Sequence, residues 1–320
     1  MVKAIQPKPE HSENLRKRLG DDTFNRRLRV EDGREKEFYC LLSDKFTFFK
    51  QHLIRPLEKF ILKITGLYKK GYAELLSPVI RENFIYFDTK LPSSFNDYKI
   101  LHISDLHIDM DDKLAIVLSN AISNLDYDIC VMTGDYRNLT VGAFDKTIAK
   151  MAILKEAIDK EAYLVLGNHD FLAMVPELEK LGYKVLLNEH ISIESAHGEK
   201  ITLAGVDDPV IYKTESLERA FYGVDDSTLK ILLAHSPRVY DKASLLNIDL
   251  LLAGHTHGGQ ICLPNGHHII KNDIVEDKML YGPWKYKTLN GYTTRGCGAC
   301  GLPIRLNCPP EIVIHILKRK

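Results

Sequence analysis

The feature that most constrains the fold is an alternation, from Lys99 onward, of short apolar runs and longer stretches with helical spacing. The runs have strand length and are rich in Ile, Leu and Val, and the stretches between them include 112–125 and 141–158. Such alternation predicts an α/β architecture with buried strands. The apolar runs are KILHIS (99–104), DICVMT (128–133), AYLVLG (162–167), KILLAH (230–235) and DLLLAG (249–254).

One segment departs from this alternation. Residues 186–206 contain short apolar stretches on either side of the turn sequence AHGEK. This pattern predicts a β-hairpin, and therefore some antiparallel pairing beside the parallel strands.

Each of the five runs leads into residues of types that bind metals. Ligands of open α/β sheets bind beyond the carboxyl ends of the strands, so these tips are expected to converge on one place. In an extended segment, alternate residues point to the same side, which would aim both members of D-x-H and of H-x-H into one cleft. The tip residues are Asp105 and His107, Asp135, then Asn168, His169 and Asp170, then His235, and finally His255 and His257.

The residue types at these tips indicate a particular metal chemistry. Carboxylate and amide oxygens mixed with imidazole nitrogens suit Mn²⁺, Fe or Zn²⁺, and the absence of cysteine at the tips disfavours a structural zinc site or an iron–sulfur cluster. The set is too large for one ion. Two ions about 3.5–4 Å apart that share a carboxylate would use all of it, as in hydrolytic two-metal sites.

The ordered motifs D-x-H, G-D, G-N-H-D, an isolated His and G-H-x-H resemble those of the calcineurin-like metallophosphoesterase superfamily. The resemblance covers roughly residues 97–320, and GHTHGGQ (254–260) with GLPIRLNCPPEI (301–312) resembles a bacterial subgroup that is often associated with the membrane. The resemblance implies an α/β fold in which a two-sheet β-sandwich is flanked by helices. It divides the chain into an N-terminal extension, residues 1–95, partly helical and amphipathic, and a metallophosphoesterase catalytic domain, residues 96–320.

The resemblance also assigns roles to the tip residues. The first metal would be held by Asp105, His107, Asp135 and His257, and the second by Asp135, Asn168, His235 and His255. Asp135 would bridge two divalent ions, with Mn²⁺ preferred and Fe or Zn²⁺ as alternatives. The catalytic residues would be His169, near the phosphorus, and Asp170, which would orient His169. A hydroxide shared by the ions would attack phosphorus, and His169 would protonate the leaving oxygen.

The N-terminal extension is expected to have two parts. Residues 1–37 are charged and weakly periodic, which predicts a loose tail or a solvated helix. Residues 41–70 place apolar side chains at helical spacing among many lysines, and Pro56 is expected to kink or split that helix. The helix either packs on the domain or lies in a membrane interface with its lysines facing anionic lipid.

These features leave several functions open. The leading hypothesis is hydrolysis of a phosphodiester or pyrophosphate bond, on a membrane-associated nucleotide-lipid such as UDP-2,3-diacylglucosamine of lipid A biosynthesis. A soluble nucleotide phosphodiesterase or phosphatase, a nuclease and a non-catalytic metal-binding scaffold are the alternatives. The net charge is zero, with 43 basic and 43 acidic residues, so no nucleic-acid partner is expected.

The expected location is the cytoplasm, with peripheral contact to the inner face of the cytoplasmic membrane through residues 41–70. The sequence shows no secretory signal and no apolar run of spanning length, and its six cysteines are expected to be reduced. Cys297, Cys300 and Cys308 are read as ordinary thiols, with a redox or auxiliary metal role as the alternative. Arg137 is expected at the surface, with phosphate contact as its alternative.

Overall fold

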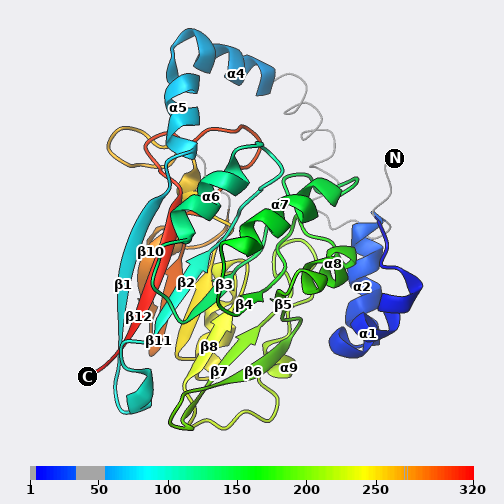
Figure 1. The fold of residues 1–320 in the computed structure, drawn as a ribbon, viewed down its shortest axis with the longest axis vertical. Coiled ribbons are helices and arrows are strands. Elements are labelled where there is room, and N and C mark those ends of the chain that lie inside the picture. The colour runs from blue at the N-terminus through cyan, green and yellow to red at the C-terminus, as the bar shows by residue number, and fades with distance from the viewer. Residues whose placement is uncertain (1–4, 34–54, 270, 272) are drawn as a thin grey trace.

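The computed structural model describes residues 5–33, 55–269, 271 and 273–320, and its strands form two six-stranded sheets (Figure 1). The first sheet has the order β1-β12-β2-β3-β4-β5, and the second has the order β10-β11-β9-β8-β7-β6. The strands are β1 (Val79–Phe87), β2 (Lys99–Ile103), β3 (Ile129–Met132), β4 (Ala162–Leu164), β5 (Lys184–Val185), β6 (Glu189–Glu194), β7 (Lys200–Gly205), β8 (Lys230–Leu233), β9 (Leu250–Ala253), β10 (Gly282–Tyr286), β11 (Leu289–Thr293) and β12 (Glu311–Arg319).

The apolar runs form the strands that the sequence predicts. In the first sheet, β2, β3, β4 and β5 run parallel, and in the second sheet β7, β8, β9 and β11 do the same. The predicted hairpin is confirmed, because β6 pairs antiparallel with β7 from Glu189↔Gly205 to Glu194↔Lys200. Parallel neighbours end at the same edge of a sheet, so the polar tips of β2, β3 and β4 lie close together, as do those of β8 and β9.

The inner faces of the two sheets pack against each other. Val131 and Val165 of the first sheet share one buried cluster with Leu203, Ile231 and Leu252 of the second. Helices α6 and α7 cover the outer face of the first sheet, and α10 contributes to a separate cluster outside the second sheet. This confirms the predicted two-sheet α/β fold flanked by helices. The helices are α1 (Pro9–Leu19), α2 (Asp21–Glu31), α4 (Arg55–Ile64), α5 (Leu67–Leu75), α6 (Leu114–Ile122), α7 (Asp145–Glu156), α8 (Val175–Lys180), α9 (Leu217–Ala220) and α10 (Tyr240–Leu245).

The N-terminal extension contributes one strand to this sandwich. β1 pairs in parallel with β12 from Val79↔Glu311 to Phe87↔Arg319 and forms the edge of the first sheet. A domain boundary between residues 95 and 96 remains a prediction.

Residues 9–31 are not the loose tail or solvated helix that the sequence suggests. They form a helical hairpin, α1 and α2, that packs beside α8 (Figure 1). Leu15, Leu19 and Phe24 are each 1% exposed and belong to the cluster under the first sheet. The low apolar content suggests a solvated segment, but the buried face of α2 also contains two charged residues, Arg27 and Glu31, which pair with each other at 3.1 Å.

The predicted helix over 41–70 is only partly observable, because residues 34–54 lie outside the described residues. Its described part is not continuous: α4 and α5 are separated at Gly66, which has φ 73°. A positive φ ends a right-handed helix, and glycine adopts it without a steric penalty. Pro56 is the second residue of α4 as described and does not interrupt it before Ile64.

No helix in the described part of the chain is long and apolar enough to cross a membrane.

Candidate metal centre

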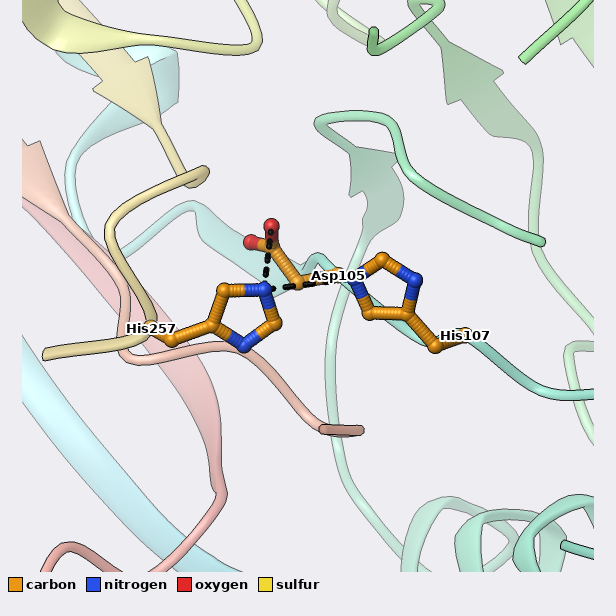
Figure 2. A group of neighbouring side chains, drawn as sticks. All are labelled: Asp105, His107 and His257. Atoms are coloured by element: carbon orange, nitrogen blue, oxygen red, sulfur yellow. Dashed lines mark hydrogen bonds and ion pairs between the residues drawn. The ribbon is translucent and has the colours of Figure 1, made fainter. Parts of the chain in front are cut away.

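The tips of β2, β3, β4, β8 and β9 meet at one place between the two sheets. The ligating atoms there form three overlapping groups, and within each group all of them lie within 4.8 Å of one another. Figure 2 shows one group, in which Asp105 and His107 from beyond β2 face His257 from beyond β9. The groups are Asp105, His107 and His257; then His107, Asp135 and His169; and then Asp135, His235 and His255.

Direct contacts link these groups. His107 Nε2 lies 3.2 Å from His257 Nε2, and His257 Nε2 lies 3.5 Å from an Asp105 carboxylate oxygen. On the other side, His235 Nε2 lies 3.1 Å from His255 Nδ1 and 3.0 Å from Asn168 Oδ1. All seven predicted metal ligands are therefore gathered at this centre.

Asp135 lies between the two sides. Its Oδ2 atom is 3.7 Å from His107 Nε2, 3.8 Å from His169 Nε2 and 3.4 Å from His235 Nε2. Its other carboxylate oxygen accepts a hydrogen bond from the backbone N–H of His169. One carboxylate is thus shared by two neighbouring sets of imidazoles.

The backbone at the centre is not extended, as the alternation argument from the sequence assumes. Asp105 has φ 49°, His107 37°, Asp135 57°, His255 72° and His257 53°. Each residue therefore sits in a left-handed turn just beyond its strand, where a side chain other than glycine is strained by about 1–3 kcal/mol. The alternate residues still reach the centre, but turn geometry aims them. Such strain is typical of functional sites.

Glycines let the loops approach closely. Gly134 has φ 93°, and a Cβ atom built on it would lie 2.6 Å from the backbone nitrogen of Gly167. A Cβ on Gly167 would lie 2.3 Å from an Asp135 carboxylate oxygen. Neither position has room for a Cβ atom, so the G-D and G-N-H-D motifs require glycine there.

Electrostatics keep several imidazoles neutral. Burial lowers the pKa of His107 to about 3 and that of His255 to about 4, and it holds the pKa of His257 well below its usual value. Neutral imidazoles have a free lone pair for a metal. The other ring nitrogen is often bonded in metal sites; His107 Nδ1 is 2.8 Å from Arg137 O, and His235 Nδ1 is 2.7 Å from Thr133 O.

The carboxyl groups of Asp105 and Asp135 have pKa values shifted in opposite directions. Burial raises the pKa of Asp105 to about 6. Burial also acts to raise the pKa of Asp135, but His235 and His169 outweigh it and hold that pKa well below its ordinary value. In return, Asp135 overcomes the effect of burial and raises the pKa of His169 and of His235 to about 10. A carboxylate that stays ionised and stabilises two cationic imidazoles also attracts metal cations.

The expected contact between Asp170 and His169 is replaced by another one. The Nδ1 atom of His169 lies 2.6 Å from Asn138 O. The Asp170 carboxylate instead accepts backbone hydrogen bonds from Gly167 at 2.8 Å, Asp135 at 2.8 Å and Tyr136 at 3.0 Å. It follows His169 in a turn that directs the two side chains differently. Asp170 thus ties the β3 and β4 tips together and does not hold the imidazole itself.

Two charged residues that the sequence does not single out support the centre. Asp273 is 4% exposed, accepts a hydrogen bond from Arg238 Nε at 2.9 Å and lies 4.0 Å from His255 Nε2. Arg305 is fully buried and donates to the backbone oxygens of His257 and Gly298. The sequence assigns neither side chain a role at the centre, although Arg305 lies within GLPIRLNCPPEI.

Arg137 is not at the surface. It is fully buried, its guanidinium lies 4.3 Å from the centroid of the Phe171 ring, and it donates to the backbone oxygens of Val141 and Gly142. Burial is possible because the charge is spread over an aromatic face and two carbonyls.

The three C-terminal thiols have different partners. Cys297 Sγ lies 3.1 Å from Glu311 O, and Cys308 Sγ lies 3.4 Å from Gly258 O. Cys300 is partly exposed, and its backbone N–H donates to the Gln260 side chain at 2.8 Å. They lie along the loops that border the metal centre.

The donor set fits a pair of divalent metal ions. Carboxylate and amide oxygens combine with imidazole nitrogens, the donor atoms converge in two neighbouring clusters, and Asp135 is common to both. His255 Nε2 is buried and has no hydrogen-bond partner, which leaves one ring nitrogen of this residue without a competing bond.

Known proteins are similar to this chain over most of its length. Residues 98–259, just over half of the chain, match the model of the calcineurin-like phosphoesterase family. An uncharacterized metallophosphoesterase of Aquifex aeolicus is 31% identical over 78% of this chain and 96% of its own length. The uncharacterized metallophosphoesterase YkoQ of Bacillus subtilis is 29% identical over 74% of this chain and 90% of its own.

A further relative carries a membrane-related name. The transmembrane protein with metallophosphoesterase domain of Bos taurus is 29% identical over 72% of this chain and 55% of its own length. The similarity to these proteins covers most of this chain, and the site has the residues of the motifs. The chain belongs to the calcineurin-like phosphoesterase family, whose members are metal-dependent phosphoesterases with a binuclear centre.

Proposed function

We propose that this phosphoesterase hydrolyses a phosphodiester or pyrophosphate bond with two ions held by the seven gathered ligands. The observation that carries the proposal is the sharing of Asp135 between neighbouring clusters. Asp105, His107 and His257 would complete the site of one ion. Asn168, His235 and His255 would complete the site of the other.

The ions, when bound, would neutralise phosphate charge and generate a nucleophile from water near neutral pH. The chain supplies the remaining functions. The Asp170 carboxylate fixes the two loops that carry Asp135 and His169. Asn138 O, 2.6 Å from Nδ1, sets the orientation of the His169 ring, so that Nε2 faces the centre. From there a protonated His169 donates to the leaving oxygen.

Mn²⁺ is the proposed metal, because the set combines carboxylate and amide oxygens with imidazole nitrogens, and Fe and Zn²⁺ are the alternatives. Metal-free protein reconstituted separately with each ion would be assayed on bis(4-nitrophenyl) phosphate. The highest turnover with Mn²⁺ supports the assignment. Turnover with Zn²⁺ or Fe alone contradicts it.

His169→Ala tests the catalytic role. The variant should keep its metal, since Asp135, His107 and His235 remain, and should lose roughly 10²-fold in turnover. Metal analysis and kcat on the same preparation check both parts. Near-normal turnover would remove His169 from the chemistry.

We also propose that the substrate lies at a membrane surface. Helix α4 exposes Leu57 (58%), Phe60 (60%) and Ile64 (68%) to solvent, and Lys59 and Lys63 lie on the same helix. An amphipathic helix with apolar and basic side chains is typical of contact with anionic lipid. The protein would then be peripheral on the inner face of the cytoplasmic membrane.

Helix α5 connects this surface to the metal centre. Gly71 O accepts a hydrogen bond from the backbone of Arg305 at 2.9 Å, and Glu74 accepts from the backbone of Asn307 and Cys308. Arg305 in turn contacts His257. A lipid-linked diphosphate such as UDP-2,3-diacylglucosamine could thus keep its acyl chains near α4 while its diphosphate reaches the ions.

A substrate screen separates the candidates. Manganese-loaded protein would be offered bis(4-nitrophenyl) phosphate, 4-nitrophenyl phosphate, UDP-2,3-diacylglucosamine and DNA. Preference for the UDP-lipid supports the proposal. Preference for a soluble diester or monoester supports a soluble phosphodiesterase or phosphatase, cleavage of DNA supports a nuclease, and metal binding without hydrolysis supports a scaffold.

Co-sedimentation with anionic vesicles tests the membrane contact. The variant L57S/F60S/I64S should lose binding. Tyr222→Ser is the matched control, because Tyr222 is 84% exposed but lies outside α4. Equal binding by both variants would contradict a role for α4.

A further inference from the structure

The N-terminal hairpin places a buried arginine against the metal centre. Arg27 of α2 is fully buried, and its Nη2 donates to the backbone oxygen of Asp170 at 2.8 Å. Its Nη1 lies 3.3 Å from Asp207, and the guanidinium stacks 3.3 Å from the centroid of the Tyr212 ring. Arg27 lies outside residues 98–259, the part of the chain that matches the family model.

Glu31, one helical turn later, makes a second contact with the same loop. Its Oε1 accepts from the backbone N–H of Leu172 at 2.9 Å and from Arg27 Nε at 3.1 Å. The hairpin therefore holds Asp170 O and Leu172 N, the backbone groups on either side of Phe171. The segment accepts one hydrogen bond from Arg27 and donates one to Glu31, and the two bonds together fix its position and its direction.

The held segment is the one that organises the centre. The Asp170 side chain accepts three backbone hydrogen bonds, from Gly167, Asp135 and Tyr136. These bonds join the loop after β4 to the loop after β3. A shift of Asp170 would therefore move both Asp135 and His169 relative to the ligands on β8 and β9.

Docking alone does not require this charge. Leu15, Leu19 and Phe24 already pack the hairpin into the core. Burying a guanidinium between carboxylates costs desolvation energy, and an apolar side chain of similar volume often serves stability equally well. The guanidinium group of arginine presents its N–H donors in a rigid plane, so a buried arginine is favoured where a backbone oxygen must be held in one geometry.

We propose that Arg27 is a positioning residue for the phosphoesterase site, acting through Asp170 on the loops that carry the metal ligands. The inference rests on the proposed function for its metal and turnover readouts. The hairpin is then a structural part of the centre, supplied by the N-terminal extension.

The test compares Arg27→Met with Arg18→Met. Arg18 is a matched control from the same hairpin: it pairs with Glu179 at 2.8 Å, with Glu189 and with the backbone oxygen of Val185, all of which lie outside the loop of Asp170. The Kd for Mn²⁺, by competition with a fluorescent chelator, and kcat and KM on bis(4-nitrophenyl) phosphate would be measured well below each variant's unfolding temperature.

We expect Arg27→Met to weaken Mn²⁺ binding and lower kcat by about tenfold or more, because groups that orient metal ligands have effects of this size. Arg18→Met should stay within about twofold of the original chain in both. Equal effects of the two substitutions, or none at Arg27, would overturn the proposal.

A milder pair covers the case in which Arg27→Met does not fold. Arg27→Lys and Arg18→Lys keep the charge but remove the fork. Hydrogen–deuterium exchange of peptides covering 133–137 and 166–172 should become faster in Arg27→Lys only. Unchanged exchange there would overturn the inference. If the original chain neither binds Mn²⁺ nor hydrolyses any phosphoester, the proposed function fails, and the exchange comparison alone decides the role of Arg27.

Discussion

The two helical parts of the N-terminal extension use their apolar side chains in opposite ways. The hairpin α1–α2 buries Leu15, Leu19 and Phe24 in the core. It also buries the charged pair Arg27 and Glu31 against the loop of Asp170. Helix α4, in contrast, leaves Phe60 and Ile64 exposed and projects away from the sheets (Figure 1). One part buries its apolar side chains beside the site, whereas the other leaves them exposed to solvent.

The largest expected difference concerns stability. Phe24→Ala removes a ring that is 1% exposed, and should lower the free energy of unfolding by about 3–5 kcal/mol. Phe60→Ala removes a ring that is 60% exposed, and should change it by about 0.5 kcal/mol or less. Urea unfolding of both variants checks the pair. Similar losses would mean that α4 packs as the hairpin does.

The next difference concerns pH: a buried carboxyl group of the hairpin, that of Glu31, makes the free energy of unfolding depend on pH. Burial raises the pKa of Glu31 from 4.5 to about 7, although Arg27 opposes the shift. The folded state then holds a proton that the unfolded state has lost. The stabilisation is complete below about pH 4.5 and is lost as pH rises through 7, at up to about 1.4 kcal/mol per pH unit.

Glu31→Gln should make this slope shallower, because the amide does not titrate while its oxygen can still accept from Leu172. The free energy of unfolding between pH 5 and 7, measured for both chains, checks the prediction. An unchanged slope would show that Glu31 is ionised throughout this range.

A smaller effect is expected on substrate choice. The variant F60S/I64S should lower kcat/KM for a UDP-lipid in vesicles by about tenfold, since lost apolar contact weakens interfacial binding. Its kcat/KM on soluble bis(4-nitrophenyl) phosphate should stay within about twofold. Parallel losses on both substrates would instead place α4 with the hairpin, as a support of the site.

The smallest effect is expected at the surface of the hairpin itself. Arg16 pairs with Asp21 at 2.9 Å, and both side chains are largely exposed to solvent. Arg16→Gln should change the free energy of unfolding by about 0–1 kcal/mol. Thermal unfolding in low and high salt checks this. A loss as large as that of Phe24→Ala would show that surface charge, not the buried face, holds the hairpin.

The sequence reveals the strand-tip residues because parallel strands bring their carboxyl ends together. Asp105, Asp135 and His257 could be placed from that rule and from the spacing of their motifs. The left-handed turns that aim them could not, because positive φ is uncommon even for Asp and His, and nothing in the motifs marks where it occurs. The break between α4 and α5 at Gly66 could not be predicted either, because the helical spacing of apolar residues continues across it.

Supporting residues are harder to find for a physical reason. Arg27, Asp273 and Arg305 are charged residues, and a charge in a sequence normally indicates a surface position. Only the folded chain shows that each is buried against a backbone oxygen, a hydroxyl or an imidazole. For the same reason, the many charged residues of α1 and α2 indicate a solvated segment when the sequence is read alone.

The most direct test of the account is the metal content of Asp135→Ala beside that of the original chain. Both would be loaded with Mn²⁺, desalted, analysed for bound metal and assayed on bis(4-nitrophenyl) phosphate. We predict about two ions per original chain, as for hydrolytic two-metal sites, and loss of both ions and of turnover in the variant. Retention of both ions with normal turnover by Asp135→Ala would contradict the claim that one shared carboxylate organises the centre.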